Sequence, residues 1–330
     1  SCLANSRTLG SAFPSTTAAS LASLGTGLEP GRHGMVGYDI LDPLQDKVVN
    51  QLGGWDEGVD PQLWQPNPTV LEQVAGQIPV VAVSLPKFAA SGMTRAALRG
   101  GTFVPAGTGH ARTRAAAEQL AAQDSVLMYL YFNELDKAGH RYGCGSVQWG
   151  HALEELDSAM RRLSAALPAD TLLLLTADHG MLDVAPERRI DYSADPALTA
   201  GLRHTGGGPR MVHLYFEPDA TAGHRERLIE AWQQSFGRQA WVLTRSEAVA
   251  HGLSGRVDDA VLPRIGDVLV AAREPVALYD MRRLPPSALE LVGQHGSLTR
   301  AEREVPLLTL ANTTGGTGAA AAAKGRRRRG

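Results

Sequence analysis

Three short motifs combine aspartate and histidine in spacings that suit a metal centre. Asp178 and His179 directly follow the apolar run TLLLLT. Asp136 and His140 lie four residues apart, just after the apolar run VLMYLYF, and His295 stands in the run GQHG. Carboxylate and imidazole ligands in this combination favour zinc, with manganese or iron as alternatives.

Each of these motifs also has a purely structural explanation. An Asp-His pair can be a turn with satisfied polar groups, and Asp136 with His140 can be a helix cap with an incidental histidine. Their joint occurrence after successive apolar runs favours a metal, because the carboxyl ends of parallel strands meet at one edge of a sheet. The other histidines lack such carboxylate neighbours and are predicted to be structural or exposed: His33, His110, His151, His204, His213, His224 and His251.

A cluster of hydroxyl side chains forms a fourth candidate site, in the run FPSTTAASL. Ser15 or Thr16 is predicted near the N-cap of a helix, and Thr17 in its first turn. The N-terminus of a helix attracts phosphate, and a hydroxyl there can attack phosphorus when a metal lowers its pKa. Taken alone, the same run is an ordinary capping motif.

The elements that must position these residues follow from the apolar patterns. Strands are expected at 79–84, 126–132, 171–176, 211–216 and 267–272, and helices at 17–24, 111–122, 147–166 and 222–236. Apolar runs without alternation are typical of parallel strands covered on both faces. The sequence therefore predicts an α/β fold: a doubly wound, mostly parallel sheet with helices on both faces and a small α+β insertion.

The order of these patterns also suggests how the chain is divided. Residues 1–209 are expected to form an N-terminally incomplete α/β core that carries the first two Asp-His motifs and the hydroxyl cluster, and 210–275 an insertion or cap. Residues 276–312 return to the core with the third motif, and 313–330 form a disordered, low-complexity tail.

Composition limits the classes of function. The chain has 330 residues, 43% of them hydrophobic, and a formal net charge of −2, which becomes −7 without the five cations of residues 324–329. An acidic body argues against a general nucleic-acid surface. The sequence contains no apolar run of ~18–20 residues that would span a membrane. Its two cysteines do not suffice for a disulfide scaffold, which favours a reducing, cytoplasmic compartment.

In combination, the motifs resemble one family. TADHGM, DKAGH and FPSTTAASLASLGTGLEPGRHG are similar to motifs of the type I phosphodiesterase/nucleotide pyrophosphatase family of the alkaline phosphatase superfamily. The resemblance covers most of residues 11–183 and returns at 293–308. It implies an alkaline-phosphatase-like fold with two divalent metal ions, zinc as the first choice, bound at the Asp and His motifs, and a small phosphorylated substrate such as a nucleotide.

The resemblance also assigns roles to individual residues. Thr17 matches the nucleophile, and its oxygen also binds one of the metals. Asp136, His140 and His295 match the ligands of one metal, and Asp178 and His179 match two ligands of the other. The implied reaction is hydrolysis of a phosphodiester or phosphoanhydride bond through a phosphothreonine intermediate. Alternatives are a phosphomonoesterase or phosphonate hydrolase of the same superfamily, or a truncated, non-catalytic domain.

The sequence departs from the family pattern at two places. The family's second metal takes a further Asp from a strand that ends in Asp-Gly upstream of the nucleophile, whereas no acidic residue precedes Glu29 here. We therefore expect the natural chain to extend upstream with that strand. The family's phosphate-contacting Asn falls near Tyr38, which becomes a candidate substrate contact, as does Arg210 because a guanidinium can bind phosphate through two hydrogen bonds.

Overall fold

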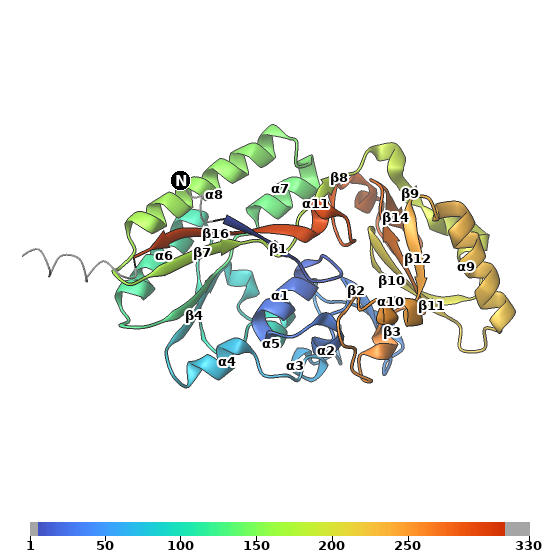
Figure 1. The fold of residues 1–330 in the computed structure, drawn as a ribbon, viewed down its shortest axis with the longest axis horizontal. Coiled ribbons are helices and arrows are strands. Elements are labelled where there is room, and N and C mark those ends of the chain that lie inside the picture. Colours follow the sequence, from blue (N-terminus) through green and yellow to red (C-terminus); the bar gives the residue numbers. More distant parts are fainter. Residues whose placement is uncertain (1–5, 314–330) are drawn as a thin grey trace, which may run out of the picture.

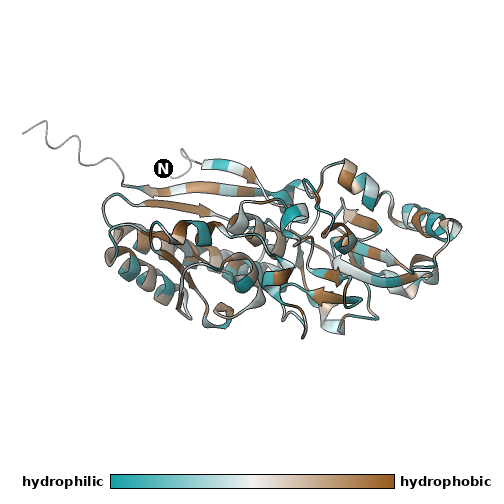
Figure 2. Ribbon diagram, turned by 90° about the horizontal axis from the view of Figure 1, so that it is seen from below, coloured by the Kyte–Doolittle hydropathy of each residue, from teal (hydrophilic) through white to brown (hydrophobic). Residues whose placement is uncertain are grey.

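The computed structural model describes residues 6–313, which form two lobes side by side (Figure 1). The first lobe, on the left in Figure 1, holds two three-stranded sheets, and the second holds one six-stranded sheet. Hydrophobic residues concentrate along the strands, while α9 (Ala222–Phe236) turns hydrophilic residues to the outside of the second lobe (Figure 2). Among the described residues, no helix has the length and apolar character needed to cross a membrane.

The first lobe contains the parallel part of the fold. Its parallel sheet has the order β5 (Thr102–Pro105), β4 (Val80–Ser84), β6 (Leu127–Leu130). Its antiparallel sheet has the order β1 (Ser6–Gly10), β16 (Glu304–Asn312), β7 (Leu172–Thr176). α6 (Gly109–Ala121) and α8 (Val147–Ala165) share one hydrophobic cluster with both sheets. α1 (Thr17–Thr26) and α5 (Gly92–Ala97) belong to a second cluster, which Tyr129 of β6 contacts.

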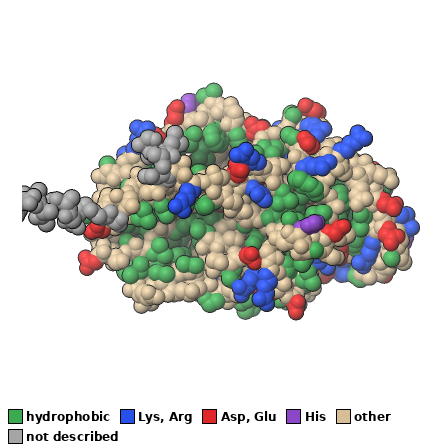
Figure 3. All heavy atoms as spheres, viewed as in Figure 1, with side chains coloured by type: hydrophobic (Ala, Val, Ile, Leu, Met, Phe, Trp, Pro, Cys, Tyr) green, Lys and Arg blue, Asp and Glu red, His purple; other side chains and the backbone are tan. Residues whose placement is uncertain are grey.

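β6 and β7 are edge strands of their sheets. Within residues 6–313, β6 pairs with β4 and β7 with β16, so each strand has one edge without a partner strand. Both strands nevertheless contribute to the same cluster, through Met128 and Leu130 of β6 and Leu173 and Leu175 of β7. Hydrophobic side chains are visible over a wide part of the first lobe (Figure 3). The expectation of a further strand in this lobe stays a prediction.

The second lobe is built on a continuous antiparallel sheet. Its order is β12 (Ala240–Thr244), β13 (Val268–Ala272), β11 (Met211–Phe216), β10 (Leu202–Gly208), β2 (Asp39–Asp42), β3 (Lys47–Asn50). β11 and β13 are buried at every position. One face packs with α9 and the other joins the cluster of α1 and α5, which explains why these antiparallel strands lack the usual alternation.

The structure also contains two pairs of short strands and several shorter helices. Two pairs of short strands are β9 (Arg189–Asp191) with β14 (Ala277–Tyr279), and β8 (Leu182–Asp183) with β15 (Gly293–Gln294). The remaining α-helices are α2 (Pro30–His33), α3 (Pro61–Trp64), α4 (Val70–Ala75), α7 (Glu134–Tyr142), α10 (Arg245–Ala250) and α11 (Arg300–Arg303).

The α/β fold is confirmed, with two differences in detail. Parallel pairing is limited to β4, β5 and β6 and the short pair β9–β14, so most of the pairs are antiparallel. The second difference concerns residue 210, where a boundary is expected: Gly208 pairs with Met211 in the β10–β11 hairpin, and β2 and β3 extend the same sheet. The division of the chain into domains stays a prediction. The predicted tail lies outside the described residues from 314 onward.

Candidate active site

α7 presents two of the predicted ligands on one face. The helix begins shortly after β6, and Asp136 and His140 lie one turn apart along it. The Nε2 atom of His140 is 3.4 Å from Oδ1 of Asp136. The four-residue spacing noted in the sequence is thus a helical spacing, which brings the two side chains together.

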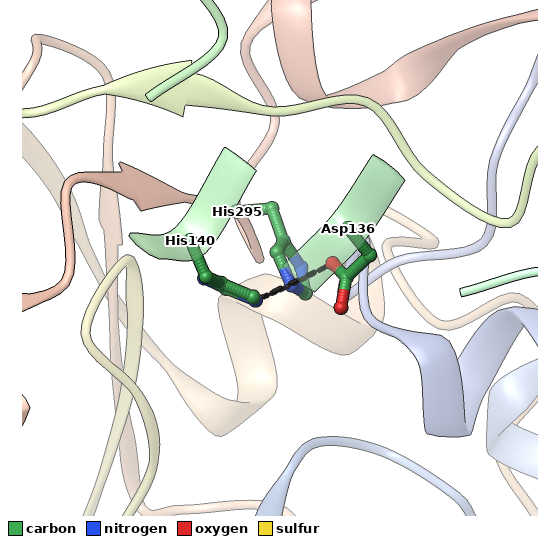
Figure 4. Close-up of side chains that lie close together, drawn as sticks. All are labelled: Asp136, His140 and His295. Atoms are coloured by element: carbon green, nitrogen blue, oxygen red, sulfur yellow. Dashed lines mark hydrogen bonds and ion pairs between the residues drawn. The ribbon is translucent and has the colours of Figure 1, made fainter. Parts of the chain in front are cut away.

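His295 reaches the same place from a distant part of the chain. It follows β15, and its Nε2 atom lies 3.3 Å from Nε2 of His140 and 3.9 Å from Oδ1 of Asp136. One possible ligand atom from each of the three residues lies within 4.8 Å of the others. Figure 4 shows the three side chains pointing toward one another.

Asp178 and His179 follow the carboxyl end of β7, as the sequence predicts. The Nε2 atom of His179 is 3.6 Å from Oδ2 of Asp178 and 3.9 Å from Oδ1 of Asp136, so the second motif adjoins the first. The next residue must be glycine, because a Cβ at Gly180 would lie 2.0 Å from the carbonyl oxygen of Ala301. This close approach holds the Asp-His turn against the segment that follows His295.

The hydrogen bonds of the three histidines show which ring nitrogen is free to bind a metal. In each ring Nδ1 faces a backbone carbonyl, which only accepts, so Nδ1 donates there and Nε2 is the nitrogen left for a metal. The three bonds are His140 to Gly293 (2.8 Å), His179 to Gly180 (2.9 Å) and His295 to Ser15 (2.8 Å).

The atoms that face the centre of the site are therefore all electron-pair donors. Three Nε2 lone pairs lie around Oδ1 of Asp136, a buried oxygen that has no hydrogen-bond partner among the described residues. Burial lowers the pKa of His295 well below its usual range, and neighbouring His179 and His140 lower it further. Three imidazole nitrogens and an orphaned carboxylate oxygen fit a divalent cation, which would satisfy them together.

Thr17 stands at the edge of this group. Thr16 is the N-cap of α1, where its Oγ1 accepts a hydrogen bond from the backbone N–H of Ala19 at 3.4 Å, and Thr17 is the first residue of the helix. The Oγ1 atom of Thr17 lies 3.1 Å from Nε2 of His179. Its side chain is half-buried and points to the same atoms that the histidines surround.

Ser15 ties the threonine segment to the His295 loop. It is fully buried, and its hydroxyl donates to the carbonyl of Ser297 at 2.8 Å and accepts from the N–H of Gly296 at 3.1 Å. Its own N–H donates to the carbonyl of Gly296 at 3.2 Å. Together with the bond from His295, four hydrogen bonds join the two segments at this one residue.

The structure corrects the prediction that Arg210 binds substrate. Its side chain is fully buried, and its guanidinium bonds Glu302 and the backbone carbonyls of 272, 274 and 276. These partners occupy its donors, so none is directed at a substrate. Tyr38 is 39% exposed and lies before β2, with its Cβ near Gly208. Its substrate contact stays a prediction.

Sequence reasoning missed the supporting residues of this site. From the sequence, Ser15 is predicted only as a possible helix cap. Nothing in the sequence distinguishes Glu302, because an acidic residue in the run TRAERE is typical of a solvated helix face. Its burial arises from contacts with Arg210, far away in the chain. Such long-range pairing has no local pattern from which to predict it.

Comparison with known proteins places this site in a family. The family model for type I phosphodiesterase/nucleotide pyrophosphatase matches residues 2–298. Murine ectonucleotide pyrophosphatase/phosphodiesterase 5 is 18% identical with a TM-score of 0.70, over 91% of this chain and 78% of that chain. Phosphonoacetate hydrolase from Sinorhizobium meliloti 1021, in complex with phosphonoformate, is 17% identical with a TM-score of 0.66, over 92% and 81%.

A further solved structure is an inactive threonine-to-alanine form of the murine protein in complex with AMP, with 18% identity and a TM-score of 0.69 over 91% and 78% of the two chains. At these identities the structural neighbours support the fold, whereas the family match covers most of the sequence. The chain belongs to the type I phosphodiesterase/nucleotide pyrophosphatase family, hydrolases of the alkaline phosphatase superfamily.

Proposed function

We propose that this protein hydrolyses phosphodiester or phosphoanhydride bonds in a metal-dependent reaction with Thr17 as nucleophile. The observation that carries the proposal is the position of the Thr17 hydroxyl, 3.1 Å from Nε2 of His179 and at the N-terminus of α1. It adjoins a group of lone-pair donors centred on Asp136. A nucleophile, a cation-binding group and a helix N-terminus thus meet at one point.

The donor set would hold two divalent ions, with zinc as the first choice. Asp136, His140 and His295 would bind one ion, and Asp178, His179 and the Thr17 oxygen the other. Bound there, such ions supply Lewis-acid stabilisation of charge on phosphoryl oxygens and lower the pKa of a hydroxyl. The second set has one carboxylate, one imidazole and one hydroxyl, which is the weaker combination.

The residues of the chain then have distinct tasks in the reaction. The N-terminus of α1 orients its backbone N–H groups and its positive dipole end toward the phosphoryl group. Oγ1 of Thr17 forms a bond to phosphorus as the bond to the leaving oxygen breaks, and the proton of the hydroxyl passes through water to the leaving oxygen. A water oxygen then bonds to phosphorus as the bond from phosphorus to Oγ1 breaks, and a proton of that water restores the Thr17 hydroxyl. The carbonyl bonds to Nδ1 keep His179 and His295 oriented throughout.

The structural neighbours support a small phosphorylated substrate. AMP is bound by the inactive murine form, and phosphonoacetate hydrolase is described with phosphonoformate and phosphonoacetate. The murine form is inactive as a threonine-to-alanine variant, which agrees with a threonine nucleophile. A nucleotide diester is our first choice of substrate, and a phosphonate or phosphomonoester is the alternative.

One set of assays tests the proposal. Purified protein is loaded with zinc or manganese and given bis(p-nitrophenyl) phosphate, p-nitrophenyl phosphate and phosphonoacetate. Thr17→Ala should lower turnover of the preferred substrate by at least about a thousandfold, because the nucleophile is lost. Thr17→Ser should retain part of the activity. Unchanged turnover in Thr17→Ala would exclude this nucleophile.

Metal content separates the enzyme from a non-catalytic domain. Native mass spectrometry of the wild type, Asp136→Ala and Asp178→Ala would show which ion each carboxylate holds. We expect Asp136→Ala to lose the more tightly bound ion and Asp178→Ala only the weaker one, because Asp136 faces three imidazoles. A wild type that binds no divalent metal would support the non-catalytic alternative.

A further inference from the structure

We infer that the buried ion pair between Arg210 and Glu302 is a positioning device, which holds the His295 loop in register with α7 and with the Thr17 segment. The inference rests on the proposed role of His295 as a metal ligand. Both side chains of the pair are fully buried, and Nη2 of Arg210 lies 2.7 Å from Oε2 of Glu302. Arg210 belongs to the second lobe, and Glu302 lies in α11, directly before β16 of the first lobe. The pair therefore connects the two lobes.

Glu302 is the centre of four hydrogen bonds. Its Oε1 accepts from Nε of Arg210 and from the backbone N–H of Ser297, both at 3.0 Å. Its Oε2 accepts from Nη2 of Arg210 at 2.7 Å and from the hydroxyl of Thr299 at 2.5 Å. The carboxylate therefore bonds the loop that begins at His295 at two positions, Ser297 and Thr299.

Arg210 anchors this carboxylate to the second lobe. It lies in the β10–β11 turn, and its Nη1 donates to the carbonyls of Val276, at 2.8 Å, and Glu274. Its Nη2 also donates to the carbonyl of Ala272, the last residue of β13, at 3.3 Å. The guanidinium thus fixes the loop to the end of a fully buried strand.

The opposite side of the loop is held by Ser15. The serine hydroxyl bonds the carbonyl of Ser297 and the N–H of Gly296, and its carbonyl accepts from Nδ1 of His295. Two residues later in the chain stands Thr17. Ser15 and Glu302 therefore both bond Ser297, two residues after His295, and a shift of that residue would move His295 relative to Thr17.

Burial of this pair costs free energy that hydrophobic packing would not cost. The bonds of Glu302 to the loop indicate the function of the pair: it keeps the loop in one position and provides an acceptor for the Ser297 N–H. A functional site needs its ligands within ~0.5 Å of the productive geometry, and residues that support a metal ligand typically change metal affinity ~10–100-fold when removed.

The test compares Glu302→Gln with a control that breaks a different ion pair. Asp267→Asn removes the carboxylate that lies 3.0 Å from Nη2 of Arg245 in the second lobe, away from the His295 loop. We expect Glu302→Gln to weaken binding of the tighter Zn²⁺ ion ~10–100-fold. Its Co²⁺-loaded form should show a visible absorption spectrum altered toward that of His295→Ala. Asp267→Asn should lower the melting temperature but leave affinity and spectrum unchanged.

A second readout needs no metal. In the metal-free protein, hydrogen exchange at the amides of Gly296 and Ser297 should be at least about tenfold faster in Glu302→Gln than in the wild type, because the Ser297 N–H loses a charged acceptor. Equal exchange in the two proteins would overturn the inference, whatever the metal titration shows. A wild type that binds no metal would overturn the proposed function instead.

Arg210→Lys keeps the charge but loses the forked geometry, and it serves if Glu302→Gln fails to fold. It should show the same changes in Zn²⁺ affinity, cobalt spectrum and amide exchange, but smaller ones. Metal affinity, cobalt spectrum and amide exchange that all match the wild type in a folded Arg210→Lys or Glu302→Gln protein would assign the pair to stability alone.

Discussion

The histidines of two regions differ in which ring nitrogen carries the proton. In the active site, His140, His179 and His295 donate from Nδ1 to carbonyls. Outside it, Nδ1 of His33 accepts the N–H of Met35, and Nδ1 of His213 accepts the N–H of Gly266, both at 3.1 Å. In the first group Nε2 is therefore the nitrogen left to bind a metal, whereas the second group presents an N–H there.

This difference separates a ligand from a structural histidine more sharply than burial does. His33, His213 and His295 all have a pKa lowered by burial, to about 3 for the first two. Only His295 has its Nε2 among other lone pairs, near Asp136 and His140. Nε2 of His33 faces the hydroxyl of Ser23 at 3.0 Å, as a donor.

The largest expected effect is the loss of metal affinity when a proposed ligand histidine is removed. His295→Ala should weaken binding of the tighter Zn²⁺ ion by at least about a hundredfold, because loss of a ligand exceeds the ~10–100-fold effect of losing its supporting bonds. His213→Ala should leave the affinity unchanged, although it leaves a cavity in the second lobe. Competition with a chromophoric chelator measures both. Similar losses in the two variants would mean that the tautomers do not distinguish ligands.

Much of the fold was predictable because its apolar runs are local. The expected strand at 211–216 and helix at 222–236 coincide with β11 and α9, and 126–132 contains β6. β10 was missed because LRHTGGG has the composition of a loop, and only pairing with β11 makes it a strand. The apolar run of β11 suggested a parallel strand, whereas contact with both hydrophobic clusters explains it.

The candidate site was predictable only as a set of motifs. Asp136, His140 and Thr17 follow from spacing and capping within short segments. Their convergence with His295 depends on contacts across most of the chain, such as the bond from His295 to Ser15. The misassigned Arg210 shows the same limit, since an arginine after GGGP looks exposed until Glu302 arrives from elsewhere.

A smaller effect is expected from pH, through the structural histidines. The folded protein holds His33 and His213 neutral down to a pKa of about 3, whereas the unfolded chain protonates them near 6.5. The unfolded state thus binds more protons below pH 6.5, so stability falls as the pH drops from there. Each residue contributes up to ~1.4 kcal/mol per pH unit. Burial of His295 acts in the same direction.

Urea unfolding of metal-free protein at pH 7, 6 and 5 measures this slope. In His213→Phe the slope of unfolding free energy against pH should lose the contribution of one histidine. His151→Ala, at an exposed position, should leave the slope unchanged. An equal slope in the wild type and His213→Phe would show that His213 is not held neutral in the folded state.

The smallest expected effect is that of an exposed leucine in β7, and a buried leucine in β11 serves as its reference. Leu214 of β11 is fully buried, whereas Leu174 of β7 is 49% exposed beside a strand edge without a partner in residues 6–313. Leu214→Ala should cost ~2–5 kcal/mol of unfolding free energy, since it leaves a cavity. Leu174→Ser should change it by no more than ~0.5 kcal/mol, as is usual for exposed positions. Denaturant titration measures both. A cost above ~2 kcal/mol for Leu174→Ser would mean that this face of β7 is covered in solution.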